Sequence, residues 1–223
     1  MSTTFDVINP ATEKLVTSLQ EADVAHTDEI IAKAAKAFLN WKKVSPGDRA
    51  NLLRRFSATV TAHREELAQL EITNSGHTRG NALWEADNVA NVLNYYAGAP
   101  ERLFGKQIPV AGGVDITFKE PIGVVGIIVP WNFPMPIASW GFAAALAAGN
   151  TVVLKPAELT PMTAVRLAEL ALVAGIPEGV LNVIVGKGSV VGARFVSNPT
   201  VRKISFTGST SVGKSIMRSE EHT

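Results

Sequence analysis

The sequence predicts an α/β protein with a mainly parallel sheet and helices on both of its faces, preceded by a helical N-terminal region and a protruding β-hairpin. Apolar, β-branched runs alternate with helical segments through the second half of the chain, which is the pattern of a parallel sheet. These runs lack apolar–polar alternation, as expected for strands covered on both faces. No charged side chain occurs over residues 121–154, so this segment is expected to lie in the core.

Helices are expected over most of the first hundred residues. Residues 9–13 have the composition of a turn at the start of the domain. Thr27 and Asp28 are the predicted cap of a first helix, and further helices are predicted from Pro46, over residues 64–74 and over residues 81–97. The apolar residues expected on the buried faces of the first and last of these helices are Ile30, Ile31, Ala34, Ala35, Phe38, Leu39, Leu83, Trp84, Ala90, Leu93 and Tyr96. No catalytic cluster is apparent here, so the region is interpreted as scaffold.

A β-hairpin is predicted over residues 103–119. Two short alternating runs, at residues 107–110 and 115–118, flank an Ala-Gly-Gly turn. Because an isolated two-stranded hairpin is marginally stable in water, we expect it to pair with another sheet in a second subunit.

The central unit is predicted over residues 123–154, where two strands flank a helix at residues 136–148. Such a βαβ unit is right-handed and brings the ends of both strands to one edge of the sheet. Three prolines between positions 130 and 136 argue against a membrane-spanning helix, and the apolar run after them is shorter than the roughly 20 residues that a bilayer requires. Further strands are predicted at residues 180–185 and 203–206, with helices between and after them.

The composition excludes several classes of function. The chain has 223 residues and a formal net charge of +1, which gives no reason to expect a nucleic acid or an anionic membrane as partner. It contains no cysteine, and therefore no disulfide, thiolate metal site or thiol nucleophile. The four histidines are scattered, so no metal site is predicted. The first residues do not resemble a signal peptide, and a cytoplasmic location is expected.

Two glycine-rich turns follow predicted strands. Residues 208–215 match the P-loop pattern G-x-x-x-x-G-K-[ST] between a strand and a helix. A P-loop normally opens its domain, whereas only eight residues follow Ser215, so a nucleoside triphosphatase is a third hypothesis. Gly186, Gly188 and Gly192 are one residue off the dinucleotide fingerprint, a pattern that a tight turn also explains. Both turns suit a diphosphate, because backbone N–H groups at a helix start bind anions.

Polar side chains follow the two central strands. Lys155 and Glu158 come directly after the second strand, where an ammonium and a carboxylate can bind ribose hydroxyls. A solvated charged pair is the alternative. Asn132 is held between Pro130 and Pro134, and its NH₂ group can donate to a developing oxyanion, although an asparagine that serves a turn fits as well. These groups are expected to converge on one cleft at the sheet edge.

Five segments in this order and spacing resemble the aldehyde dehydrogenase superfamily: Ile-Asn-Pro-Ala-Thr at residues 8–12, Tyr-Tyr-Ala-Gly at 95–98, Pro-Trp-Asn-Phe-Pro at 130–134, Lys-Pro-Ala-Glu at 155–158 and Phe-Thr-Gly-Ser-Thr at 206–210. The similarity extends from the N-terminus to about Met217. It implies a Rossmann-like NAD-binding domain over residues 1–102 and 120–223, an oligomerisation hairpin over residues 103–119, and the absence of the catalytic domain.

The resemblance also implies a reaction, the NAD(P)-dependent oxidation of an aldehyde to an acid through a covalent thiohemiacetal. It places the aldehyde oxygen at Asn132 and the adenosine ribose at Lys155 and Glu158. The other cofactor-binding residues that it implies are Ile128, Pro130 and Trp131 along the cofactor, Gly188, Gly192 and Val212 on the adenine side, and Gly208 and Ser209 on the pyrophosphate side, together with Thr207.

One departure from the family affects the expected activity. The family's nucleophilic cysteine and general-base glutamate have no counterpart in these residues, and the sequence departs from the family after Met217. We therefore expect a truncated chain that is inactive alone, with an aldehyde substrate of unknown identity and a homo-oligomeric full-length form. Glu158 predicts NAD rather than NADP, because a carboxylate repels a 2′-phosphate. The alternative is a non-catalytic nucleotide-binding or assembly module that co-oligomerises with a full-length relative.

Overall fold

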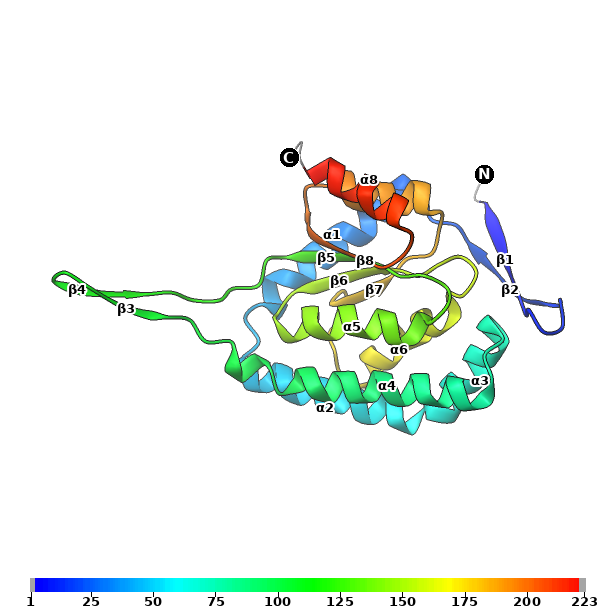
Figure 1. The fold of residues 1–223 in the computed structure, drawn as a ribbon, viewed down its shortest axis with the longest axis horizontal. Coiled ribbons are helices and arrows are strands. Elements are labelled where there is room, and N and C mark those ends of the chain that lie inside the picture. The colour runs from blue at the N-terminus through cyan, green and yellow to red at the C-terminus, as the bar shows by residue number, and fades with distance from the viewer. Residues whose placement is uncertain (1–2, 221–223) are drawn as a thin grey trace.

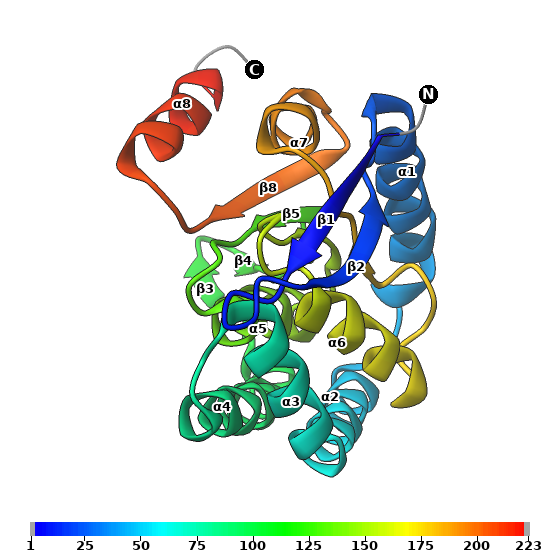
Figure 2. The same ribbon diagram turned by 90° about the vertical axis from the view of Figure 1, so that its right-hand side faces the viewer.

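The computed structural model describes residues 3–220, and its elements form stacked layers around one sheet. α1 and α7 cover one face of the sheet, α5 and α6 cover the other, and α2, α3 and α4 form an outer layer beyond α5 and α6 (Figures 1 and 2). The bounds of the helices are α1 Val24–Trp41, α2 Pro46–Ala62, α3 Arg64–Ser75, α4 Arg79–Ala97, α5 Pro134–Ala147, α6 Met162–Val173, α7 Ala193–Ser197 and α8 Thr210–Glu220, with a 3₁₀ turn at Pro100–Arg102 and a π-helical turn at Gly188–Gly192.

In the part of the chain that the structure describes, the central sheet has four parallel strands. They are β5 (Val124–Ile128), β6 (Thr151–Lys155), β7 (Leu181–Val183) and β8 (Val201–Phe206), in the spatial order β7-β6-β5-β8. Within residues 3–220, β8 pairs with β5 alone, so it is an edge strand. The predicted class and the four predicted strands are confirmed, with small shifts at the strand ends.

The sheet has a hydrophobic core on each face, which explains why its strands are apolar without alternation. α5 is apolar on all sides because it packs between the sheet and α4. Its fully buried Phe142 stacks on Phe56 of α2, with ring centroids 5.9 Å apart. On the opposite face, Ile31 of α1 and Phe195 of α7 pack in the second core.

The predicted helical N-terminal region is present, but a β-hairpin that was not predicted precedes its helices. β1 (Thr4–Ile8) and β2 (Leu15–Gln20) form an antiparallel hairpin before α1, with the predicted turn between them. Val7 is the one buried residue of these two strands, so the hairpin carries no continuous apolar pattern by which the sequence would reveal it.

The predicted cap of α1 was wrong. Asp23 caps the helix, since its carboxylate accepts a hydrogen bond from the His26 N–H at 2.8 Å. Thr27 and Asp28 lie within the helix instead, where Thr27 is buried and Asp28 accepts hydrogen bonds from Arg194. α1 therefore begins at Val24, three residues before the predicted cap at Thr27.

Two large side chains expected in the core are exposed: Leu39 of α1 at 56% and Trp84 of α4 at 50%. In α4 the buried stripe passes through Glu85 rather than Trp84, and this change of face brings a carboxylate into the interior. The other predicted helices are present with ends that shift by up to two residues, and the predicted start at Pro46 and the left-handed Gly76 after α3 are confirmed.

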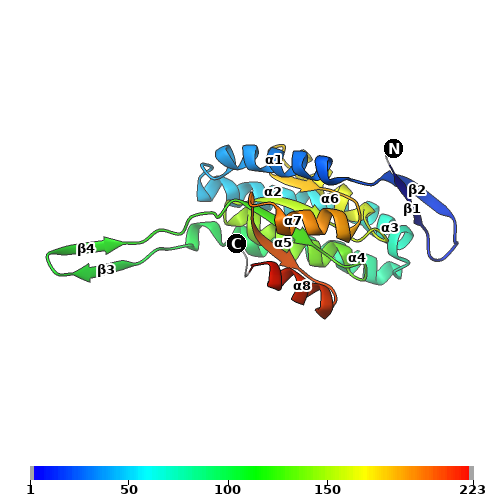
Figure 3. The same ribbon diagram turned by 90° about the horizontal axis from the view of Figure 1, so that it is seen from above.

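The predicted hairpin is present as β3 (Gln107–Val110) and β4 (Gly113–Ile116), an antiparallel pair whose second strand begins two residues earlier than predicted. It projects far from the layered body, and all of its strand residues are exposed (Figures 1 and 3). No helix within residues 3–220 combines the length and the apolar character needed to cross a membrane.

Candidate functional site

Three neighbouring strands end together at one edge of the sheet. Ile128, at the end of β5, lies opposite Lys155 of β6 on one side and opposite Phe206 of β8 on the other. The ladder extends one step further, because the Thr207 N–H donates to the Ile128 carbonyl at 3.0 Å. The loops that carry Asn132, Glu158 and Ser209 therefore all start from the same sheet edge.

The strand order creates a crevice at this edge. The chain builds β6 and β7 on one side of β5 and then crosses over to place β8 on the other side. In open parallel sheets, ligands bind outside the carboxyl ends of the strands at such a reversal of strand order. The reversal lies between β5 and β8, beside the loops of Asn132 and Ser209.

The loop after β5 holds Asn132 at the surface. The Thr160 hydroxyl donates to the Trp131 carbonyl at 3.2 Å, and the buried Pro134 begins α5. Phe133 packs against Trp84, with centroids 6.2 Å apart. Asn132 itself is exposed, and no hydrogen bond to another described residue occupies its amide. The amide is thus free to bind an external group, while the backbone around it is fixed.

Lys155, Glu158 and Gly188 are linked directly. A Glu158 carboxylate oxygen accepts a hydrogen bond from the Gly188 N–H at 3.1 Å and lies 3.7 Å from the Lys155 ammonium. The Lys155 side chain is 4% exposed, whereas that of Glu158 is 38% exposed. Burial lowers the pKa of Lys155, and Glu158 opposes that shift. The carboxylate is therefore held in place by two partners and still reaches solvent.

The turn after β8 opens α8 with exposed polar groups. A Cβ atom at position 208 would lie 2.6 Å from the Phe206 ring, so glycine fits here without a close contact. The Ser209 hydroxyl accepts a hydrogen bond from the Val212 N–H at 3.4 Å. A helix N-terminus with N–H groups facing solvent is a suitable site for a phosphate.

The predicted site residues fall into two groups. One group is joined directly, because Glu158 contacts Gly188 and Lys155, and Thr207 bonds to Ile128, which lies opposite Lys155. Gly192 belongs to the same group, since a Cβ atom on it would lie 3.6 Å from the Ile128 side chain. Pro130, Trp131, Asn132, Gly208, Ser209 and Val212 are placed at the same edge by the strands that they follow.

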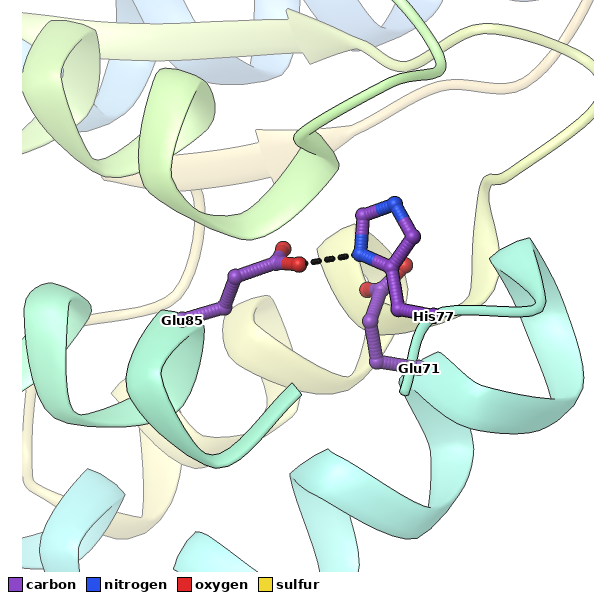
Figure 4. Close-up of side chains that lie close together, drawn as sticks. All are labelled: Glu71, His77 and Glu85. Atoms are coloured by element: carbon purple, nitrogen blue, oxygen red, sulfur yellow. Dashed lines mark hydrogen bonds and ion pairs between the residues drawn. The ribbon is translucent and has the colours of Figure 1, made fainter. Parts of the chain in front are cut away.

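One cluster of ionisable residues was missed by the sequence analysis. The side chains of Glu71 in α3, His77 and Glu85 in α4 point toward one another (Figure 4). One atom from each side chain that could bind a metal ion lies within 4.8 Å of the corresponding atoms of the other two. His77 lies in the turn between the two helices, and its ring contacts that of Phe133 at 5.4 Å between centroids. The feature of the sequence that could have indicated this cluster is Glu85, which falls in the apolar stripe of α4, four residues before Val89.

Comparison with known proteins identifies the family. The family model described as "Aldehyde dehydrogenase family" matches residues 1–223. The chain belongs to the aldehyde dehydrogenase family. A curated relative, cytosolic 10-formyltetrahydrofolate dehydrogenase from Pongo abelii, is 45% identical over 224 residues, which cover 97% of this chain and 25% of the relative.

Solved structures agree with this assignment to the aldehyde dehydrogenases. PnpE in complex with nicotinamide adenine dinucleotide has a TM-score of 0.96 at 38% identity, covering 98% of this chain and 45% of that one. An E. coli NADP-dependent enzyme has a TM-score of 0.96 at 37% identity, covering 99% and 46%. The chain thus spans a quarter of the length of the first relative and under half of these structures.

Proposed function

We propose that the chain is the cofactor-binding part of an NAD-dependent aldehyde dehydrogenase, which oxidises an aldehyde to a carboxylic acid. The observation that carries the proposal is that β5, β6 and β8 end at one edge of the sheet. The Asn132 amide, the Lys155–Glu158 pair and the N-terminus of α8 follow these three strand ends. The assignment of the chain to the aldehyde dehydrogenase family supports this interpretation.

The residues at this edge fit a nicotinamide dinucleotide. The Glu158 carboxylate, fixed by the Gly188 N–H, and the Lys155 ammonium are suited to ribose hydroxyls. Thr207, Gly208 and Ser209 precede α8, whose N-terminus suits the diphosphate. Ile128, Pro130 and Trp131 would line the cofactor, with Gly188, Gly192 and Val212 on the adenine side. When bound, the cofactor accepts a hydride.

Asn132 is the proposed oxyanion donor. Its amide is exposed at the end of a loop that Thr160 and Pro134 hold in place. A preorganised donor of this kind contributes about 3 kcal/mol to stabilising a developing oxyanion. The chain contains no cysteine to form a thiohemiacetal, so we expect no turnover by the chain alone.

Calorimetry with the purified chain tests cofactor binding. We expect saturable NAD binding, weaker binding of NADP, and weaker NAD binding by Glu158→Ala. Glu169→Ala is the control, because Glu169 is an exposed residue on α6 that pairs with Arg166. Absence of NAD binding by the folded chain would contradict the cofactor assignment, and production of NADH from an aldehyde would contradict the predicted inactivity.

The exposed hairpin favours a second function, in assembly. Its strands carry the exposed apolar side chains Ile108, Val110, Val114 and Ile116, which a partner sheet would cover. The full-length form is proposed to be a homo-oligomer, and this chain would join it as a non-catalytic module. Co-purification with a full-length relative, lost when the hairpin residues become polar, is the expected result.

Two further predictions have direct tests. A nucleoside triphosphatase at residues 208–215 would hydrolyse ATP in a manner that Lys214→Ala abolishes, and we expect no such hydrolysis. A cytoplasmic location stays a prediction, because relatives of similar identity carry both cytosolic and mitochondrial names, and cell fractionation checks it.

A further inference from the structure

The cluster at the junction of α3 and α4 lies outside the cofactor edge and has a different chemistry. α3 ends at the left-handed Gly76, and Thr78 caps α4, so His77 is held in the short turn between Glu71 and Glu85 (Figure 4). The side chains thus converge because the two helices pack against each other. An imidazole and two carboxylates from three separate positions share one small space.

Both carboxylates are fully buried and incompletely satisfied. Glu71 and Glu85 are each 0% exposed. One oxygen of Glu71 accepts a hydrogen bond from the Thr163 hydroxyl at 2.8 Å, and one oxygen of Glu85 contacts Nδ1 of His77. The second oxygen of each carboxylate, Oε1 of Glu71 and Oε2 of Glu85, is buried without a hydrogen-bond partner within the described chain. Orphaned buried oxygens of this kind are rare in folded proteins.

The cluster also lacks a compensating cation from the protein. Over residues 3–220, no lysine or arginine forms an ion pair with Glu71 or Glu85. Buried charges in proteins are normally paired or coordinate a metal ion. A divalent cation from outside the chain would compensate both carboxylates, whereas without one burial raises the pKa of Glu71 and of Glu85 and favours their protonated forms.

We propose that Glu71, His77 and Glu85 form a binding site for one divalent transition-metal ion, with Zn²⁺ as the best-fitting case. This inference departs from the sequence-based prediction of no metal site, and it does not rest on the proposed function. Imidazole nitrogen and carboxylate oxygen are both ordinary zinc ligands, and they suit Mg²⁺ less well because that ion prefers oxygen and water.

The geometry needs only a small closure to hold the ion. Zinc bonds of about 2.0–2.2 Å place tetrahedral ligand atoms about 3.4 Å apart, compared with the present spread of up to 4.8 Å. The ion would take the place of the hydrogen bond between His77 and Glu85 and would engage an orphaned oxygen. Access is from the turn, where the His77 side chain is 19% exposed and both of its neighbours reach solvent.

Titration calorimetry of the EDTA-stripped chain with ZnCl₂, MnCl₂ and MgCl₂ tests the proposal. We expect one Zn²⁺ per chain, weaker Mn²⁺ and Mg²⁺ binding, and a rise of the melting temperature with Zn²⁺. Glu85→Gln and His77→Gln should each weaken Zn²⁺ binding by at least about tenfold. His26→Gln is the matched control, because His26 forms an exposed pair with Glu29 at 3.3 Å, without a third donor. Unchanged Zn²⁺ affinity in the two cluster variants, or no saturable binding by the wild-type chain, overturns the site.

X-ray absorption at the zinc edge supplies a test that needs no variant. The site predicts one imidazole and light-atom ligands at about 2.0–2.2 Å. Two or more imidazoles in the spectrum would place the ion elsewhere and overturn the proposal.

Discussion

Replacing Glu85 with glutamine tests how the buried carboxylate affects stability in the metal-free chain. Burial, and secondarily the neighbouring Glu71 carboxylate, raises the pKa of Glu85 from 4.5 to about 8. Between these values the folded chain keeps a proton on Glu85, whereas the unfolded chain has lost it. The contribution of this group to the free energy of unfolding is therefore greatest below pH 4.5 and falls as the pH rises toward about 8.

The size of the effect follows from the width of this window. Each pH unit changes the folding equilibrium by about tenfold, so the whole window corresponds to about 5 kcal/mol. That is a large part of the roughly 5–15 kcal/mol that stabilises a typical domain. Glutamine keeps the shape and stays neutral, and it should therefore remove most of this decline. Some decline remains in this variant, because burial also raises the pKa of Glu71.

Urea unfolding in EDTA at pH 5, 6, 7 and 8 measures the decline. The wild-type chain should lose stability steadily across the series, and Glu85→Gln should stay much more nearly level. Glu29→Gln, an exposed glutamate that pairs with His26, is the control and should follow the wild type. Parallel curves for the wild type and Glu85→Gln would refute the reasoning, because they would show that Glu85 gains no proton on folding.

Three further predictions concern packing and cofactor choice. Gly126→Ala should lower the free energy of unfolding by about 1–3 kcal/mol in urea melts, because the new Cβ atom would lie 2.9 Å from the Phe195 ring and 3.2 Å from Val201. An unchanged unfolding midpoint would show that α7 can shift to accept the methyl group without loss of stability. Phe142→Ala should cost about 3–5 kcal/mol by the same assay, since it removes a fully buried ring stacked on Phe56, and Trp140→Phe, at a half-exposed position of the same helix, should cost much less. Glu158→Gln should narrow the preference for NAD over NADP in calorimetric titrations, because it removes the charge that repels a 2′-phosphate; an unaltered ratio of the two affinities would assign the preference to another residue.

The central unit was predictable because one physical constraint determines it. Strands buried on both faces must be apolar throughout, so residues 121–154 show their strands and helix directly. The polar groups that follow, Asn132, Lys155 and Glu158, could then be placed at one edge from the topology of parallel strands alone. The bond from Gly188 to Glu158 joins loops that are far apart in the sequence, and no local pattern encodes it.

The cluster of Glu71, His77 and Glu85 was not predictable for a similar reason. Its geometry depends on how α3 and α4 pack across the turn at Gly76, which is a tertiary property. The sequence pattern also favoured Trp84 as the buried residue of α4, since a large aromatic side chain is normally a better core residue than a glutamate. Trp84 instead packs at the surface against Phe133, and the helix turns Glu85 inward.

Within residues 3–220, the position of β8 at the edge of the sheet bears on how strands of separate molecules could pair. An edge strand presents unpaired backbone groups that can template the addition of a strand from another molecule, which leads to aggregation. β8 carries Arg202 and Lys203, both exposed, next to each other in its sequence. Arg202 lies at the irregular step in the pairing of β8 with β5, where Val124 pairs with Val201 and Val125 pairs with Lys203. Two adjacent positive charges at this edge would repel the same strand of a second molecule and so oppose pairing of the two edges.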